Sequence, residues 1–140
     1  RPRASYFISI LSQIRRSLAS GKGNSLSMVE RACLVKDVII SKSVFSFMVY
    51  AWPSSVIISI NSMMRNFLWS GSILKRKIIT VPWTQFCLPY TRGGLEIKNI
   101  SLFNQSQQAQ FHWKLLNSTS EALNFLRYRF LKKLKGHTTY

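Results

Sequence analysis

The chain has 140 residues, of which 46% are apolar or aromatic, so it is long enough for one domain with a buried core and too apolar for a disordered basic tail. Twenty Lys and Arg residues stand against four acidic residues, and the formal net charge is +16. Internal ion pairs can neutralise few of these cations, so most must face water or a polyanion. The charge therefore favours nucleic acid or an anionic membrane as partner, with a basic surface that has no dedicated partner as the alternative.

The two cysteines, Cys33 and Cys87, lie far apart and form no CxxC pair, so the sequence predicts free thiols and no disulfide framework. Residues 1–20 lack the compact apolar run and small-residue cleavage site of a signal peptide. These features predict an intracellular protein of the nucleus or cytoplasm that is not secreted. The start at Arg1-Pro2-Arg3, without an initiator methionine, predicts a fragment of a longer chain.

The uncharged stretch from Ser43 to Met64 is long enough to span a membrane as a helix. Pro53 interrupts it and six serines dilute it, so the end of one helix and the start of another is the favoured interpretation. A membrane partner is therefore unfavoured, although a basic membrane-associated protein stays a third hypothesis.

Helical spacing of apolar residues predicts a first helix over 6–18. Its inward stripe is Phe7, Ile10, Leu11, Ile14 and Leu18. A second helix over 28–49 begins at a capping box formed by Ser27 and Glu30. The inward face predicted for it is Leu34, Val38, Phe45 and Val49.

After Pro53, a third helix is predicted over 55–69, with Gly71 as its stop. Its inward stripe is Val56, Ile60, Met63 and Phe67, which Ile57, Met64 and Leu68 widen. Next, the strand-like segments 78–81 and 95–97 predict a two-stranded ribbon around a short helical turn at 83–87.

A fourth helix is predicted over 101–116, with a weak inward face because Ser106 falls in the stripe. That face is Leu102, Ala109, Trp113 and Leu116. The last helix begins at a capping-box pattern, Ser118 to Glu121, and carries basic residues in its C-terminal half. The predicted fold class is mostly α: about five amphipathic helices in a small bundle with a short two-stranded β ribbon.

The residue types needed for catalysis are scarce. The four acids form no paired carboxylates for two-metal chemistry, and His112 and His137 have no metal-ligand spacing with either cysteine. No glycine-rich phosphate loop is present. The sequence therefore predicts no catalytic or metal residue, no cofactor and no small-molecule substrate.

What remains is a pattern of basic clusters with aromatic residues nearby, which is typical of nucleic-acid binding. Arg31 and Lys42 lie on nearly one side of the second helix, and a solvated edge or a pair of phosphate contacts explains them equally well. The candidate binding residues are Arg31, Lys42, Lys75, Arg76, Lys77, Arg92, Arg127, Arg129, Lys132 and Lys133. The expected partner is RNA, DNA or an RNA–DNA hybrid.

An ordered series of segments covers residues 1–116. It comprises Arg1-Pro2-Arg3-Ala4-Ser5-Tyr6-Phe7, Leu18-Ala19-Ser20-Gly21-Lys22-Gly23, Leu26-Ser27, Arg65-Asn66-Phe67-Leu68-Trp69-Ser70-Gly71, Val81-Pro82-Trp83, Cys87-Leu88-Pro89-Tyr90-Thr91-Arg92-Gly93-Gly94-Leu95 and Asn99-Ile100-Ser101-Leu102-Phe103-Asn104-Gln105. This series resembles the region just after the polymerase core in plant LINE-type (non-LTR) retroelement reverse transcriptases.

The resemblance implies a thumb- and connection-like helical region over 1–116, followed by a basic C-terminal helix and tail over 117–140. It also implies RNA-directed DNA polymerase activity for the whole protein, whose metal-binding aspartates lie upstream of this segment. This piece would then be a non-catalytic fragment that holds template–primer through backbone phosphates, and whether the chain has any enzyme activity stays open.

Several positions depart from the family pattern. Gly21 stands where the family has Trp, Val29-Glu30 where it has Ala-Gly, Glu96 where it has Gly, and Ser106-Gln107-Gln108 where it has Ala-Leu-Leu. Loss of a buried Trp costs roughly 3–5 kcal/mol where the site cannot collapse. A decayed transposon relic with no retained function is therefore the alternative hypothesis.

Overall fold

The computed structural model describes residues 3–20 and 22–135, without the side chains of residue 130 and residues 132–135. The chain is mostly helical, as predicted, and no strand occurs in these ranges. The α-helices are α1 (Ile8–Ser20), α2 (Met28–Val49), α3 (Ser54–Ser70), α4 (Trp83–Phe86), α5 (Ile100–Asn117) and α6 (Glu121–Lys135). Short 3₁₀ turns occupy Ala4–Phe7, Gly23–Ser25 and Tyr90–Arg92.

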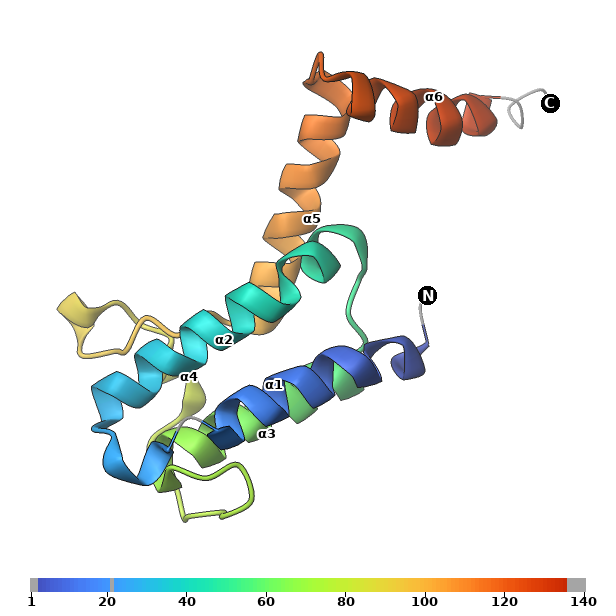
Figure 1. Ribbon diagram of the computed structural model, residues 1–140. Coiled ribbons are helices and arrows are strands. Elements are labelled where there is room, and N and C mark those ends of the chain that lie inside the picture. The colour runs from blue at the N-terminus through green and yellow to red at the C-terminus, as the bar shows by residue number, and fades with distance from the viewer. Residues whose placement is uncertain (1–2, 21, 136–140) are drawn as a thin grey trace.

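Helices α1 and α3 lie side by side, α2 packs against both, and the first turns of α5 pack against α2 (Figure 1). The predicted stripe of the first helix is confirmed, because Phe7, Ile14 and Leu18 are buried. The stripe of α3 is confirmed as well, and all four of its predicted inward residues are buried. Amphipathic spacing is read correctly here because each of these helices turns one face to the core.

Helix α2 begins as predicted, with the Ser27 and Glu30 side chains bonded reciprocally to each other's backbone amides. Its predicted inward face is confirmed at Val38, which is buried, and at Leu34, which is partly buried against the core, but it is wrong at Phe45 and Val49, which are 81% and 58% exposed. The helix contacts α1, α3 and α5, so its buried surface is wider than a single stripe. The buried residues are Ala32, Val35, Val38, Ile39, Ser43 and Phe47.

The join between α2, α3 and α5 is built around Asn104, which is only 4% exposed. Its amide donates to the carbonyl oxygens of Phe47 and Tyr50 at 2.8 Å each, and its Oδ1 accepts from the Trp52 amide at 2.9 Å. One side chain thus satisfies three backbone groups that the end of α2 and the following linker leave unpaired. The Trp52 ring completes the join by packing on Phe47 at a centroid distance of 4.4 Å.

The inward face predicted for α5 is wrong, because Leu102, Trp113 and Leu116 are 62%, 68% and 58% exposed. The buried positions are Ile100 and Asn104, so the register is set by a polar residue that apolar periodicity cannot single out. Ser106 is exposed, so it does not weaken the packing of the helix. The polar side chain at position 106 therefore does not indicate a decayed copy. Gly21, which stands where the family has Trp, lies outside the described residues.

The predicted β ribbon is also wrong. The amides of Leu95 and Ile97 donate to the carbonyl of Phe86 at 3.1 and 3.2 Å, and Glu96 donates to Leu88 at 2.9 Å. Residues 95–97 therefore pair with the end of α4, and residues 78–81 stay extended without a partner strand. The short helical turn predicted at 83–87 is confirmed as α4.

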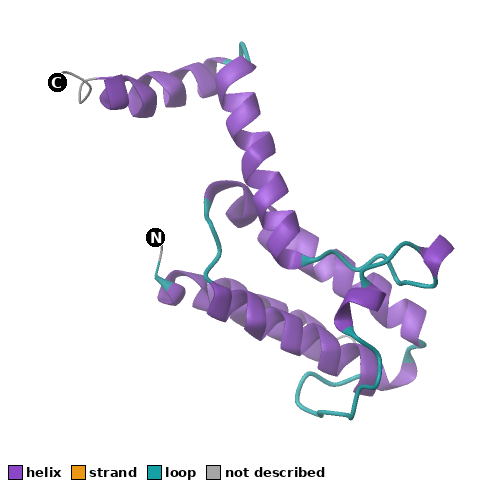
Figure 2. Cartoon of the chain, turned by 180° about the vertical axis from the view of Figure 1, so that it is seen from behind, coloured by secondary structure: helices purple, strands orange, loops and turns teal. Residues whose placement is uncertain are grey.

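The second half of α5 and the whole of α6 extend away from the helical core as an arm (Figures 1 and 2). The capping box predicted at Ser118 is not formed, since its hydroxyl accepts from the Ser120 amide at 3.2 Å and Ser118 ends α5. Arg127 joins the two helices by donating to the carbonyls of Leu115 and Ser118 at 2.8 Å each.

Candidate nucleic-acid interface

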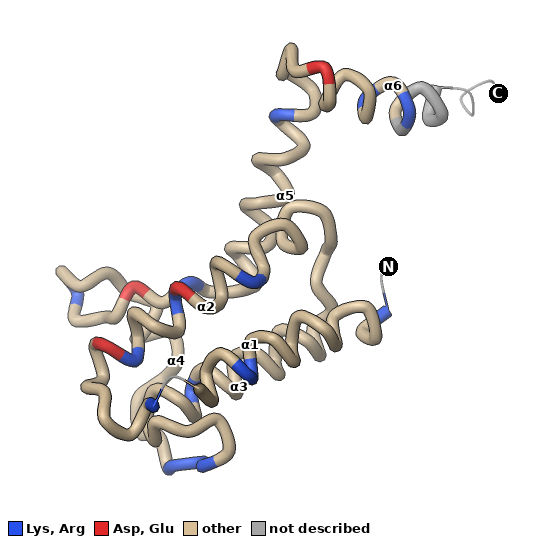
Figure 3. The backbone as a smooth tube through the Cα atoms, viewed as in Figure 1, with Lys and Arg blue, Asp and Glu red and all other residues tan. Residues whose placement is uncertain are grey.

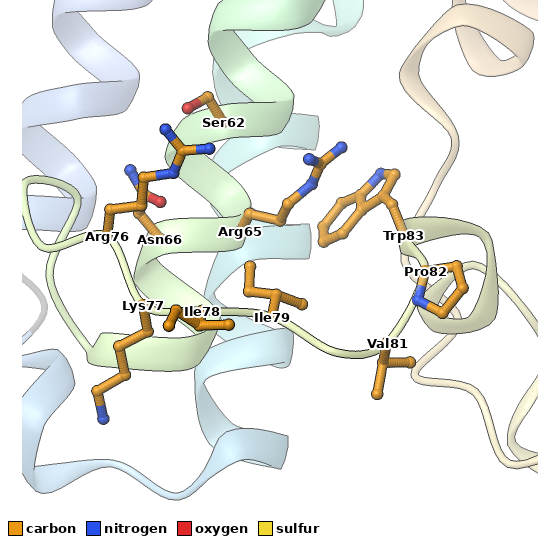
Figure 4. Close-up of a pocket in the computed structure, with 10 residues that line it drawn as sticks. All are labelled: Ser62, Arg65, Asn66, Arg76, Lys77, Ile78, Ile79, Val81, Pro82 and Trp83. Carbon is orange, nitrogen blue, oxygen red and sulfur yellow. The ribbon is translucent and has the colours of Figure 1, made fainter.

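A surface pocket of about 770 Å³ lies between α3 and the extended segment 76–83 (Figure 4). Its cationic lining comes from Arg65 of α3 and from Arg76 and Lys77 of the segment. Ser62 and Asn66 add polar groups from α3, and the remaining wall is apolar, from Ile78 to Trp83. Three of the candidate binding residues, Lys75, Arg76 and Lys77, therefore lie at or beside one concave site.

The end of α3 determines where the basic segment runs. Gly71 ends the helix with φ of 72°, and its amide donates to the carbonyl of Phe67 at 2.8 Å. The hydroxyl of Ser70 lies 2.9 Å from the carbonyl oxygen of Lys75, and the Asn66 amide donates to Ile73 at 3.1 Å. These bonds tie the start of the segment to α3, so the cations that follow are held over the pocket.

Arg65 and Trp83 form a cation–π pair on one side of the pocket. The Arg65 guanidinium carbon lies 5.4 Å from the centre of the Trp83 ring, within the range of a cation–π contact. The Trp83 ring also lies 5.7 Å from the Phe86 ring, and its Nε1 is buried with no hydrogen-bond partner in the described chain. The indole is therefore positioned by ring packing, and Arg65 is held against it.

The cations of the pocket have no anionic or hydrogen-bond acceptor partner among the described residues. The side chains of Arg65, Arg76 and Lys77 are exposed, and none of them forms a hydrogen bond or ion pair with another described residue. In Figure 4, Arg76 extends along α3 toward Ser62, whereas Lys77 points the opposite way. The pocket thus offers guanidinium groups on its walls and an ammonium group outside them to an incoming anion.

Two of the predicted binding residues are used by the fold. The half-buried Arg31 donates from Nε to the carbonyl of Gly23 at 2.7 Å and from Nη1 to that of Leu68 at 3.0 Å. Arg127 makes the corresponding bonds at the end of α5. Both arginines satisfy carbonyl groups near helix ends, a role that explains them without a ligand.

The other predicted residues are dispersed. Lys42, Arg92 and Arg129 are exposed, and they lie on α2, on the 3₁₀ turn Tyr90–Arg92 and on α6 (Figure 3). The side chains of Lys132 and Lys133 lie outside the described residues. The structure therefore brings Lys75, Arg76 and Lys77 together with each other and leaves the remaining candidates apart from them.

Sequence reasoning missed Arg65 as a binding residue and left Trp83 as a neighbouring aromatic. Arg65 is a lone charge on α3, so no basic cluster draws attention to it. Both residues lie in segments that resemble the reverse transcriptases, and this position is the signal that could have identified them. Arg65 begins the segment 65–71, and Trp83 ends the segment 81–83.

A second pocket, of about 700 Å³, contains Lys36, Cys87, Glu96 and Lys98. Lys36 donates to the Tyr90 hydroxyl at 2.9 Å, and Lys98 lies 5.9 Å from the Phe103 ring. Burial raises the pKa of the Cys87 thiol, which keeps this sulfur protonated at neutral pH. Lys36 is engaged by Tyr90, and Glu96 places a carboxylate in the lining, which makes this pocket the weaker anion site of the two.

Among the described residues, no three His, Cys, Asp or Glu side chains gather in a way that could hold a metal ion. None of the helices described is both long enough and apolar enough to cross a membrane.

Comparison of this chain with known proteins finds one similar sequence. The chain is 28% identical over 110 residues to an Arabidopsis thaliana protein named "putative ribonuclease H protein", a match that covers 79% of this chain and 18% of the relative. No protein-family model and no solved structure matches the chain. The chain is therefore similar to one stretch of this plant protein and spans less than a fifth of its length.

Proposed function

We propose that this chain is a non-catalytic, thumb-like segment of a retroelement reverse transcriptase and that it holds template–primer nucleic acid through backbone phosphates. The observation that carries the proposal is that Arg65, Arg76 and Lys77 line one pocket and that none of them has a hydrogen-bond acceptor among the described residues. A polyanion would supply the missing acceptors and offset the repulsion among the cations.

Two further observations support the proposal. Two of the segments that resemble the reverse transcriptases, 65–71 and 81–83, include part of the pocket lining, with Arg65 and Trp83 among it, whereas Arg76 and Lys77 lie between them. The plant relative is named as a ribonuclease, an enzyme class that acts on RNA, which agrees with a nucleic-acid partner for this chain. The polymerase activity implied by the resemblance belongs, under this proposal, to a larger protein.

The test is binding of the full chain to a fluorescently labelled RNA–DNA hybrid, measured by anisotropy across salt concentrations. Each phosphate neutralised adds about 0.9 to the log–log salt slope on duplex DNA, and we expect a similar dependence on the hybrid. The double variant Arg76→Gln/Lys77→Gln should lower the slope by about 2 and weaken binding to all sequences alike.

The matched control is Lys98→Gln/Lys114→Gln, which removes the same charge away from the pocket. An equal loss of affinity in both double variants would show that only net charge matters and would refute a located interface. A chain without cooperative thermal unfolding, or without salt-dependent binding, would instead support the hypothesis of a relic with no retained function.

A further inference from the structure

The pocket beside α3 contains more than phosphate-binding groups. Ile78 and Ile79 line it together with the cations, and Ile78 is 95% exposed to solvent. Phosphate contacts alone would leave that apolar side chain in water. An apolar surface placed among guanidinium groups instead suits a ligand that carries both a flat apolar face and a negative charge.

The Arg65–Trp83 pair supplies a platform for such a face. Both residues line the pocket, and the Arg65 guanidinium carbon lies 5.4 Å from the centre of the Trp83 ring, so the pocket wall carries a guanidinium plane beside an indole plane (Figure 4). Bases stack on guanidinium planes as well as on aromatic rings, and each stacked base contributes substantially to binding. Arg76 lies on the neighbouring wall, where it can pair with the phosphate of the same nucleotide.

We infer that this pocket holds one unpaired nucleotide of the bound nucleic acid, with its base on the Arg65 guanidinium and its phosphate at Arg76. This inference rests on the proposed function and deepens it. In a continuous duplex the base faces are stacked inside and only base edges and phosphates reach a protein, so a base can enter the pocket only from a single-stranded stretch. A volume of about 770 Å³ leaves room for one nucleotide, since small-ligand pockets range over roughly 300–1,000 Å³.

The experiment compares three labelled probes with the full chain at one salt concentration. The first is a blunt RNA–DNA hybrid, the second carries a short single-stranded extension, and the third carries an extension of equal length made of abasic sites. The abasic extension adds the same phosphates without bases, so it isolates stacking from charge. We expect about tenfold tighter binding to the extension with bases than to the abasic one.

Two variants test whether the gain comes from this pocket. Arg65→Lys keeps the charge but loses the planar group, and it should reduce the gain to about twofold, measured as the ratio of its own affinities for the two extensions. Ile78→Asn leaves the net charge unchanged and should reduce the gain to about threefold through lost apolar contact. Lys98→Gln, outside the pocket, should leave the gain intact, and circular dichroism checks that each variant is folded.

Equal affinity for the two extensions, or a gain that persists in folded Arg65→Lys, would overturn the inference. Binding to the blunt hybrid without any gain refutes the inference and leaves the proposed function standing. Failure to bind all three probes refutes both.

Discussion

Arg31 and Arg65 are the same residue type in two opposite situations. Arg31 is half-buried, and two of its nitrogens donate to the carbonyls of Gly23 and Leu68. Arg65 is exposed, forms a cation–π contact with Trp83 and has no acceptor among the described residues. The first arginine joins α2 to the end of α3, and the second faces a pocket.

The difference shows that a net charge of +16 overstates the surface available to a polyanion. Arg31 and Arg127 both donate to carbonyls near helix ends, so part of the charge serves the fold. Under the proposed function, the cations that bind are those without an acceptor among the described residues, which the sequence does not reveal. The contrast between Arg31 and Arg65 can be tested with substitutions in the packed region around Arg31 and in the pocket, by measuring both unfolding free energy and hybrid binding.

The largest expected effect is that of Gly71→Ala. Gly71 has φ of 72°, and a Cβ there would lie 2.6 Å from the carbonyl carbon of Gly23. A left-handed alanine costs about 1–2 kcal/mol and overpacking about 1–3, so the variant should lose roughly 2–5 kcal/mol of unfolding free energy in chemical denaturation. It should also disturb the end of α3 that positions the basic segment.

Gly93→Ala is the matched control, because Gly93 has φ of 74° but nothing lies within 4 Å of a Cβ built on it. It should lose only the conformational part, about 1 kcal/mol. If the two variants were equally stable, the close approach of Gly71 to Gly23 would contribute nothing to the fold.

The next effect in size is that of Arg31→Lys. A lysine cannot make the two bonds from one fixed plane, and hydrogen bonds to charged groups contribute about 1.5–3 kcal/mol each. We expect a loss of about 2 kcal/mol of unfolding free energy, with little change in hybrid binding at temperatures where the chain stays folded.

Arg65→Lys should show the reverse, with stability changed by less than about 0.5 kcal/mol because the side chain is exposed. A large loss of stability in Arg65→Lys, or a specific loss of binding in folded Arg31→Lys, would remove the distinction between the two arginines.

Sequence reasoning worked where one rule governs one element. The capping box at Ser27, the stop at Gly71 and the stripes of α1 and α3 depend on local chemistry or on a single buried face, and all were correct. It failed on α2 and α5, where several partners or a buried amide decide the register. Asn104 is polar, so apolar periodicity assigns it to the surface, although its three hydrogen bonds bury it.

The candidate site was predictable only in part. Lys75, Arg76 and Lys77 are adjacent in sequence, so their cluster is visible without a structure. Arg65 and Trp83 meet only because the chain reverses after Gly71 and returns past α3. The pairing of residues 95–97 with the end of α4 escaped prediction for the same reason, since strand-like composition does not specify the partner.

Two of the segments that resemble the reverse transcriptases, 18–23 and 65–71, pack together around Arg31. Gly23 and Gly71 approach so closely that a Cβ on either would collide with the backbone of the other. Arg31 then bonds to Gly23 and to Leu68, so the segments 18–23 and 65–71 meet at one arginine. The end of the first segment and the end of the second are therefore joined by one packing arrangement, whereas Arg65, at the start of the second, faces the pocket.

The smallest expected effect concerns Glu30, whose carboxylate completes the start of α2 one residue before Arg31. The Ser27 backbone amide, at 2.6 Å, and then the Ser27 side chain lower the pKa of this carboxyl below its usual range. Because the folded pKa is lower than the unfolded one, the contribution is fully present above the unfolded pKa and is lost as pH falls through the folded pKa. Unfolding free energy should therefore drop more steeply over acid pH in the wild type than in Glu30→Gln, as denaturation at a series of pH values would measure.

Since the carboxyl is fully exposed, the difference should be small and should shrink in high salt. Parallel pH profiles of the two proteins would show that the cap contributes through its geometry and not through its charge.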